Sequence, residues 1–343
     1  MKKRRSRLIV LSAASGLSLL AAGGYRQIGT IPIGGTGGWD YLTVDDQTNR
    51  LYVSHTTEVD VVDLKSSSVV GKITGLTRVH GIAIAGDLNK GFISDGGANQ
   101  VVAFDFKTLG VLNKIAAGTN PDGIVYDPFS KRVFAFNGRS KDASAIDATT
   151  GAVAGAIALG GKPEFPVSDG EGSVYDNIED KNEIVRIDSK RLTITARWPV
   201  APCESPSGLA IDTSNRRLFS VCDNKMMAVV DADSGKVIAT PAIGDEPDAA
   251  AYDPKAKLAF SSNGDGTLTV IRQADKDHYS VVENVQTKEG ARTMALDAAT
   301  HRIYLSSAEY GAAPAGTAQN PHPRKTVLSG TFKILILSSG TSE

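Results

Sequence analysis

Residues 121–160 read PDGIVYDPFSKRVFAFNGRSKDASAIDATTGAVAGAIALG. Four short β-prone runs lie within them, at residues 124–128, 132–137, 143–147 and 152–157, and each is bounded by Asp, Pro, Gly, Asn or Ser. Short runs of this kind separated by turn residues predict one four-stranded antiparallel unit with tight turns.

The same unit recurs along the chain about every forty residues. Its second run is found at residues 51–55, 91–95, 132–137, 173–175, 218–222, 260–263 and 302–307. The seventh unit stops one strand short, whereas residues 26–34 have the pattern of a fourth strand without the first three. Pairing these two segments would close a ring and remove both sheet edges. The sequence therefore predicts an all-β, seven-bladed β-propeller of four-stranded antiparallel blades, with the N-terminal strand completing the last blade.

The repeated segments also resemble a known family. Residues 50–54 read RLYVS, residues 302–306 read RIYLS, and residues 231–235 show the recurrent Asp followed by small turn residues and Gly. In these motifs, residues 25–340 resemble the YVTN-repeat, YncE-like family of exported seven-bladed propellers. The resemblance implies fold and export, but it says almost nothing about chemistry, because the repeated residues build the blade.

Residues 1–23 have the pattern of a secretory signal peptide. Five Lys and Arg precede an apolar run at residues 8–20, and the segment ends in small residues. An uncleaved anchor is the alternative, but the run is shorter than the roughly 20 apolar residues of a spanning helix. We therefore expect a periplasmic or secreted protein with no membrane span after signal removal, and a single propeller domain at residues 24–343.

Composition narrows the class of partner. The chain is 41% hydrophobic and has 35 glycines, as a turn-rich globular β protein needs. Without the leader it carries 32 Lys and Arg against 38 Asp and Glu, a formal charge of −6. This acidic balance argues against nucleic acid as a partner. We expect a monomer.

The chain has two cysteines, Cys203 and Cys222. Cys203 lies in the loop before the fifth unit, and Cys222 lies at the end of that unit's second strand. Both positions are at the same end of one blade, so we expect a disulfide in an oxidising compartment. A buried free pair, or Cys222 acting as a ligand, is the alternative.

Antiparallel order brings the start of strand one and the end of strand two to the same end of each blade. At the start of strand one the seven units carry Asp40, His80, Asp122, Glu164, Ser207, Asp248 and Arg292. At the end of strand two they carry His55, Asp95, Asn137, Cys222, Asn263 and Ser307, with Asn177 assigned to the fourth unit. We expect these two polar rings to meet at one channel mouth. From them we predict a ligand site formed by Asp40, His55, His80, Asp122, Asn137, Glu164, Ser207, Asp248, Asn263 and Arg292.

Four of the strand-one residues are carboxylates. At an effective dielectric of about 20 and a separation of ~8 Å, each ionised pair costs about 2 kcal/mol. A bound cation or a raised pKa would offset this repulsion. Calcium accepts six to eight oxygen ligands, so we predict a divalent cation held by Asp122, Glu164 and Asp248. The alternative is a solvent-filled channel whose rim is merely polar.

Two further features lie at this end of the predicted ring. His55 and His80 could be neighbours that supply an acid and a base or two metal ligands, or they could be hydrogen-bonded loop histidines. Residues 308–330 interrupt the seventh unit with prolines and alanines. A long loop inside a compact repeat is either a functional lid or disordered.

Three functions follow from this reading. The first is non-catalytic binding of a small polar ligand, a cation or another exported protein at the acidic mouth. The second is a metal-assisted lactonase, another hydrolase or a lyase at the same face. The metal-dependent propeller lactonases use Glu, Asn and Asp ligands, and Glu164, Asn137, Asn263 and Asp248 are the same residue types. The third is a rigid interaction platform.

Overall fold

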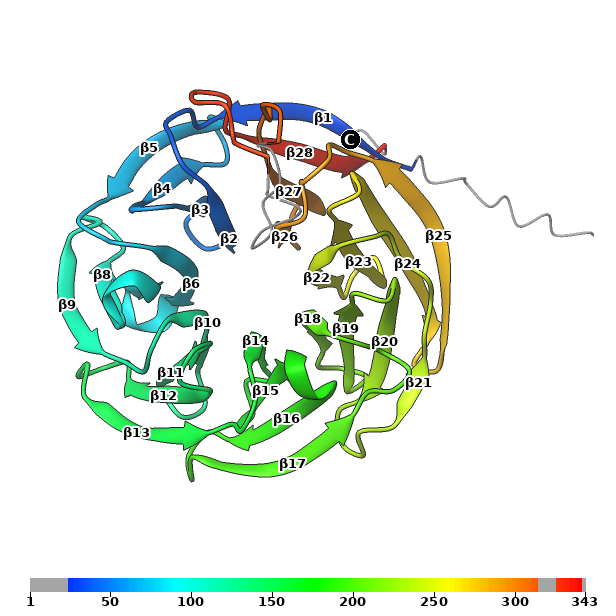
Figure 1. Cartoon of the computed structure of the whole chain (residues 1–343), viewed down its shortest axis with the longest axis horizontal. Helices are drawn as coiled ribbons and strands as arrows, with labels where there is room; N and C mark the ends of the chain where they lie inside the picture. The colour runs from blue at the N-terminus through cyan, green and yellow to red at the C-terminus, as the bar shows by residue number, and fades with distance from the viewer. Residues whose placement is uncertain (1–23, 314–324, 341–343) are drawn as a thin grey trace, which may run out of the picture.

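The computed structural model describes residues 24–313 and 325–340. Seven four-stranded antiparallel sheets stand around a central axis (Figure 1). In six of them the strands are ordered as in the sequence, from the innermost strand one to the outermost strand four. The predicted seven-bladed β-propeller is therefore confirmed.

The first four blades follow one another along the chain. Blade one consists of β2 (Trp39–Asp45), β3 (Arg50–His55), β4 (Glu58–Asp63) and β5 (Ser68–Ile73). Blade two consists of β6 (Val79–Ala85), β7 (Lys90–Asp95), β8 (Gln100–Asp105) and β9 (Val111–Ala116), with short 3-10 turns η1 (Gly86–Leu88) and η2 (Gly96–Ala98). Blade three consists of β10 (Pro121–Asp127), β11 (Arg132–Asn137), β12 (Asp142–Asp147) and β13 (Val153–Ala158). Blade four consists of β14 (Pro163–Ser168), β15 (Ser173–Ile178), η3 (Glu179–Lys181), β16 (Glu183–Asp188) and β17 (Thr193–Pro199).

The remaining three blades complete the ring. Blade five consists of β18 (Pro206–Asp212), β19 (Arg217–Cys222), β20 (Met226–Asp231) and β21 (Val237–Ala239). Blade six consists of β22 (Pro247–Asp253), β23 (Leu258–Asn263), β24 (Thr267–Asp275) and β25 (His278–Gln286). Blade seven consists of β26 (Met294–Asp297), β27 (Arg302–Ser307), β28 (Lys333–Ser339) and β1 (Tyr25–Pro32).

Strand β1 closes the ring. It pairs antiparallel with β28, from Tyr25 opposite Ser339 to Pro32 opposite Lys333. Ile31 is fully buried in a cluster shared by blades seven and one. The seam is therefore held by both ladder hydrogen bonds and apolar packing.

An aromatic residue in the middle of strand two marks the core of every blade. These side chains are at most 1% exposed: Tyr52, Phe92, Phe134, Tyr175, Phe219, Phe260 and Tyr304. Side chains alternate along a strand, so each strand two packs against both neighbouring blades. The hydrophobic clusters accordingly lie between blades rather than inside one.

In several blades, a basic residue at the start of strand two ties the blade to the next. Arg50 donates to the carbonyl of Phe106 at 2.6 Å, and Arg132 donates to that of Ser189 at 2.7 Å. Both carbonyls belong to the turn between strands three and four of the following blade. In blades one and three, the Arg at the start of strand two is therefore an inter-blade connector.

The predicted signal peptide at residues 1–23 lies outside the described residues, as do residues 314–324 of the predicted 308–330 insertion. Within the described ranges, no helix has the length and apolar character needed to cross a membrane.

Candidate functional site

The seven strand-one residues surround one end of the channel. Each is the second residue of its innermost strand, except Arg292, which precedes β26. The innermost strands contact their neighbours around the whole ring. The structure thus brings together Asp40, His80, Asp122, Glu164, Ser207, Asp248 and Arg292, which we call the mouth ring.

Asp40, His80 and Asp122 form the tightest group in the mouth ring. Nδ1 of the buried His80 lies 2.6 Å from Asp40 Oδ2 and 3.5 Å from Asp122 Oδ1. Burial lowers the pKa of His80, but its hydrogen bond to Asp40 and the charges of both carboxylates outweigh this and raise it. Burial and the nearby Asp40 raise the pKa of Asp122 to about 6. Their possible ligand atoms lie within 4.8 Å of one another, so the three residues could hold a metal ion.

Glu164 and Asp248 each have a cationic partner instead. Lys162 Nζ lies 2.6 Å from Glu164 Oε1, and Arg292 Nε lies 3.6 Å from Asp248 Oδ2. Burial nevertheless raises the pKa of Glu164 to about 8, against the opposing effect of Lys162. Two groups in the described residues have ligand atoms close enough to hold a metal ion. One is Asp40, His80 and Asp122, the other is His55, Glu58 and Asp60, and neither contains Glu164 or Asp248. The metal site predicted from Asp122, Glu164 and Asp248 therefore stays a prediction.

Two aromatic rings meet between the innermost strands. Tyr41 of blade one and Phe165 of blade four follow the mouth-ring residues of their strands, and their ring centroids are 4.8 Å apart. Burial raises the pKa of Tyr41 well above its usual value, as do the carboxylates of Asp122 and Asp40. The Tyr41–Phe165 contact therefore spans the channel just inside the mouth ring.

The predicted second ring does not line the mouth. His55, Asn137 and Asn263 are buried and hydrogen-bonded within their own surroundings. His55 Nδ1 lies 2.9 Å from Asp60, and its Nε2 lies 3.0 Å from the carbonyl of Thr36.

Asn137 and Asn263 are also hydrogen-bonded within their own blades. Asn137 donates to Asp142 at 2.6 Å, and Asn263 donates to Thr267 at 3.0 Å. These bonds fasten strand two to the start of strand three in one blade. Asn137 and Asn263 are therefore held within their own blades, and His55 does not share His80's partners.

Blade four also departs from the predicted alignment. Ile178, not Asn177, stands opposite the first residue of strand one, as Asn137 does in blade three. Asn177 faces blade five, where it donates to the carbonyl of Ser207 at 2.8 Å. The shift by one residue turns its side chain to the other face of the sheet.

Because of this one-residue shift, the sequence alignment did not identify Asp176 as a buried carboxyl group. Asp176 is fully buried, and neither of its oxygens has a hydrogen-bond partner among the described residues. In blade three the equivalent position is Ala135. Burial raises the pKa of Asp176 well above its usual value, and the charges of Glu164 and Asp122 add to this. Aligning blade four on its paired residues would have revealed this carboxyl in the sequence.

A cleft of about 750 Å³ opens beside the mouth ring. Loops of blades five, six, seven and one line it, with these residues: Gly38, Trp39, Asp223, Asp245, Glu246, Gly264, Glu289, Gly290, Arg292, Tyr310, Lys325 and Val327. Arg292 belongs to both the cleft and the mouth ring. Sequence reasoning missed Trp39 and Asp223, because no motif marks them.

The cleft is lined by aromatic rings and by carboxylates. The rings of Trp39 and Tyr310 lie 6.5 Å apart, and the Tyr310 hydroxyl lies where a Cβ on Gly290 would be. Asp223 and Glu246 are exposed, and their carboxylates make no hydrogen bond or ion pair with any described residue. Burial and Glu179 raise the pKa of Asp223 despite the opposing charge of Arg292. The cleft therefore holds excess negative charge beside two aromatic rings.

The other two acidic residues of the cleft are neutralised. Lys225 lies 2.8 Å from Asp245, and Lys325 lies 2.6 Å from Glu289. Lys325 belongs to the predicted 308–330 insertion, whose described ends meet in a bridge between Tyr310 and Val327. The base of the insertion thus forms one wall of the cleft.

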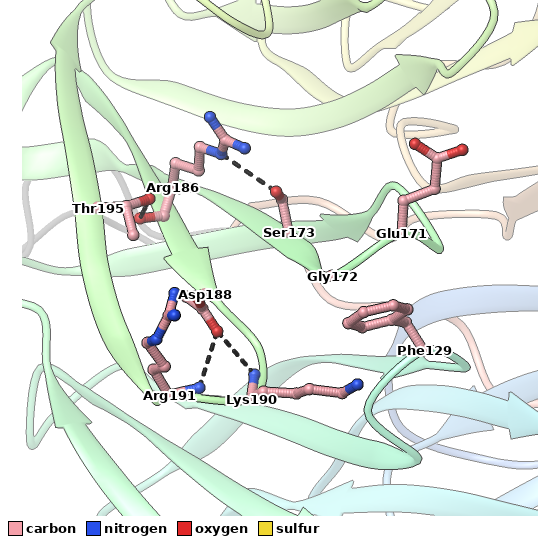
Figure 2. A pocket seen from close by; sticks show the side chains of 9 residues that line it. All are labelled: Phe129, Glu171, Gly172, Ser173, Arg186, Asp188, Lys190, Arg191 and Thr195. Atoms are coloured by element: carbon pink, nitrogen blue, oxygen red, sulfur yellow. Dashed lines mark hydrogen bonds and ion pairs between the residues drawn. The ribbon is translucent and has the colours of Figure 1, made fainter.

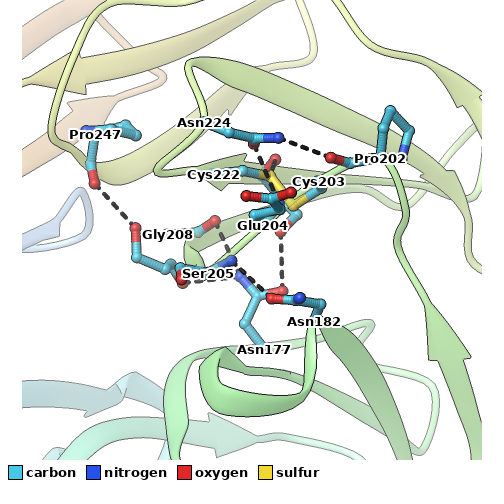
Figure 3. Close-up of a disulfide and its surroundings, with 12 residues drawn as sticks. Asn177, Asn182, Pro202, Cys203, Glu204, Ser205, Gly208, Cys222, Asn224 and Pro247 are labelled. Atoms are coloured by element: carbon cyan, nitrogen blue, oxygen red, sulfur yellow. Dashed lines mark hydrogen bonds between the residues drawn. A yellow bond between two sulfur atoms is a disulfide. The ribbon is translucent and has the colours of Figure 1, made fainter.

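A disulfide fixes the loop beside Asp223. Cys203 and Cys222 are joined, with their Cα atoms 5.6 Å apart (Figure 3). Asn224 donates to the carbonyl of Pro202 at 2.7 Å, which holds the same loop from its other side. The acidic edge of the cleft in blade five is therefore covalently anchored.

No protein-family model matches the chain, and no curated protein matches its sequence. Among solved structures, it is similar to one described as "Structure of U3-55K", with a TM-score of 0.72 and 8% identity over 91% of this chain and 98% of that chain. It is also similar to "Kuenenia stuttgartiensis Hydrazine Synthase", with a TM-score of 0.68 and 15% identity over 79% of this chain and 92% of that chain. At these identities, the likeness shows the β-propeller fold and nothing finer.

Proposed function

We propose that this propeller is a non-catalytic binding protein whose cleft beside the mouth ring takes a small polar ligand with a positively charged group. The observation that carries the proposal is the pair of unpaired carboxylates, Asp223 and Glu246, facing a cleft with Trp39 and Tyr310. A cation over an aromatic face gains about 0.5–2 kcal/mol, and nearby carboxylates add charge-assisted hydrogen bonds. An amine or guanidinium group satisfies both features.

The test compares thermal melting curves with small amines, such as putrescine, arginine and choline, against neutral and anionic compounds of similar size. A cationic ligand should raise the melting temperature by mass action. The double variant Asp223→Asn with Glu246→Gln should then lose about tenfold or more in affinity. Asp46→Asn, an exposed carboxylate in the turn between β2 and β3, is the matched control. Equal binding by the double variant, or no response to any cationic compound, would contradict the proposal.

The second candidate is metal-assisted hydrolysis, which the Asp40, His80 and Asp122 cluster favours. A histidine nitrogen beside two carboxylates fits zinc-like metals better than calcium, which prefers oxygen ligands. Elemental analysis of protein purified without chelator tests this candidate directly. A stoichiometric metal that is lost in His80→Ala would favour the enzyme. If zinc, calcium and chelator all leave the melting temperature unchanged, metal-assisted hydrolysis is excluded as a function of this cluster.

We also propose that the chain belongs to the YVTN-repeat, YncE-like propellers and is exported to the periplasm or secreted. The support is the strand-two motif at residues 50–54 and 302–306, the leader pattern of residues 1–23, and the disulfide. Cell fractionation with N-terminal sequencing of the mature protein tests export. A full-length cytoplasmic product would oppose it.

A further inference from the structure

Arg186 occupies a position that is buried and aliphatic in every other blade. It lies in β16 opposite Tyr175, the central aromatic residue of blade four. The residues opposite the equivalent aromatics are at most 8% exposed: Val61, Ala103, Ala145, Val229, Val270 and Ile336. Arg186 instead is half-buried. In blade four, the cationic side chain of Arg186 therefore stands where the other blades have a buried aliphatic side chain.

The fold does not use Arg186 to join blades. The inter-blade connector position of blade four, where Arg50 and Arg132 stand in their own blades, is Ser173. The link to blade five is made otherwise. Tyr175 donates its hydroxyl to the carbonyl of Ala232 at 3.2 Å, and Arg216 pairs with Asp169 at 3.0 Å.

The guanidinium of Arg186 is largely uncommitted. Its Nε donates to Ser173 Oγ at 3.1 Å (Figure 2). Its two terminal nitrogens make no hydrogen bond or ion pair with the part of the chain that the structure describes. A planar fork of free N–H groups matches the geometry of an oxyanion such as carboxylate or phosphate.

Arg186 opens onto a groove of about 660 Å³ at the end of blade four opposite the mouth ring. Its lining comes from the turns between strands one and two of blades three and four, from the β16–β17 turn, and from the strands of blade four. These residues are Phe129, Glu171, Gly172, Ser173, Arg186, Asp188, Lys190, Arg191 and Thr195. Three of these residues are cationic and two are acidic, which makes the groove net positive on an acidic protein.

Lys190 is a second cation of the groove, and it contacts an aromatic ring rather than a carboxylate. Its Nζ lies 3.9 Å from the centroid of the half-exposed Phe129 ring and pairs with no carboxylate among the described residues. Asp188, by contrast, accepts from the backbone N–H groups of Lys190 and Arg191 and pairs with the Arg191 side chain at 3.0 Å. Asp188 is therefore already satisfied by its own turn.

We propose that this groove binds a small molecule through an oxyanion group, a phosphate or a carboxylate. Arg186 is the bidentate donor, Lys190 the second charge, and the Phe129 ring an apolar surface for the rest of the molecule. The site is separate from the cleft beside the mouth ring and does not depend on its function.

The experiment titrates the full protein with inorganic phosphate and with citrate by calorimetry, at constant ionic strength. Arg186→Val restores the aliphatic residue of the other blades, so the variant should fold and melt no lower than the parent. It should bind the anion about tenfold or more weakly. Lys190→Gln should weaken binding about threefold, since it removes a point charge near the surface. Arg272→Gln, an exposed arginine of β24, should leave the affinity unchanged.

A second readout locates the site. Phe129→Trp places a fluorophore on the groove wall, and its emission should change on titration with the same anion. Asp223→Asn, in the other cleft, should not alter that response. The proposal is overturned if the parent binds neither phosphate nor citrate at millimolar concentration, or if Arg186→Val binds as tightly as the parent.

Discussion

The ring of Tyr41 lies against the ring of Phe165, with centroids 4.8 Å apart, although their strands belong to blades one and four. These blades are not neighbours around the ring (Figure 1). The Tyr41–Phe165 contact, which we call the strut, therefore crosses the channel. It is not part of the packing between adjacent blades. It also places an aromatic surface directly beneath the carboxylates of the mouth ring.

Removing the strut should destabilise the whole ring. We expect Tyr41→Ala and Phe165→Ala each to lower the free energy of unfolding by roughly 2 kcal/mol, since both rings are half-buried. The double variant should lose less than the sum of the two, by about 0.5–1.5 kcal/mol, because the pair interacts directly. Denaturant unfolding of the four proteins measures this difference. Strict additivity would mean that the rings do not support each other.

Asp176 should be a site where substitution stabilises the protein. Asp176→Ala introduces the residue that blade three carries at the same position, and it removes a buried carboxyl group without partners. We expect a gain of about 1–3 kcal/mol at neutral pH. The native pKa is raised, so the unfolded state ionises first as pH rises above the usual Asp range. The gain should therefore grow from about pH 4 upwards.

The measurement is thermal or denaturant unfolding of Asp176→Ala and the parent at several pH values. Asp46→Asn, which changes an exposed carboxylate, serves as the control and should have no such pH trend. A loss of stability in Asp176→Ala at pH 7 would show that the carboxyl has a partner or a packing role.

Glu164 should make the protein less stable as pH rises. Its native pKa of about 8 lies above the ordinary Glu value, so the folded state holds a proton that the unfolded state releases. Stability should fall between about pH 4.5 and pH 8, by up to about 1.4 kcal/mol per pH unit. Glu164→Gln should make the slope shallower, and the remainder belongs to Asp122 and Asp176, whose native pKa values are also raised. Unfolding curves across that range decide it, and an unchanged slope in the variant would assign the titration to another group.

The disulfide should contribute about 3 kcal/mol by restricting the unfolded chain. We expect the Cys203→Ala and Cys222→Ala double variant to unfold at correspondingly lower denaturant concentration. Reductant should lower the parent's midpoint but not the variant's. The same midpoint for both proteins without reductant would mean that the bond is not formed in the purified protein.

Deleting residues 25–34 should disrupt ring closure. The truncated protein would expose the edge of β28 and the apolar surface that covers Ile31, so we expect aggregation or a large fall in melting temperature. Size-exclusion chromatography and thermal unfolding check this outcome. Asp46→Asn, which changes an exposed side chain and leaves the seam closed, is the control.

The sequence was sufficient to predict the repeat, the number of blades, the closure and the residues of the mouth ring, because all of these follow from the strand period. It was insufficient for side chains whose role depends on partners outside the repeat. His55 and Asn137 were assigned to the mouth, yet each binds the residue five positions later, Asp60 or Asp142. That spacing is visible in the sequence and would have placed both inside their blades.

Other features carry no local signal. Tyr41 and Phe165 meet only because a ring of seven blades brings opposite strands close together, and nothing near either residue encodes the other. Trp39 and Asp223 share a cleft for the same reason. Contacts across the ring depend on its diameter, which the spacing of the repeats does not specify.

The pairing of β1 with β28 also sets an order of events during folding. Six blades can assemble from contiguous chain as it is made, but Tyr25 cannot reach Ser339 until the last strand has emerged. Closure of so large a loop is slow compared with forming a hairpin, because distant segments must first meet. The first strand therefore pairs last, and until it does, β28 is the edge strand of a three-stranded blade.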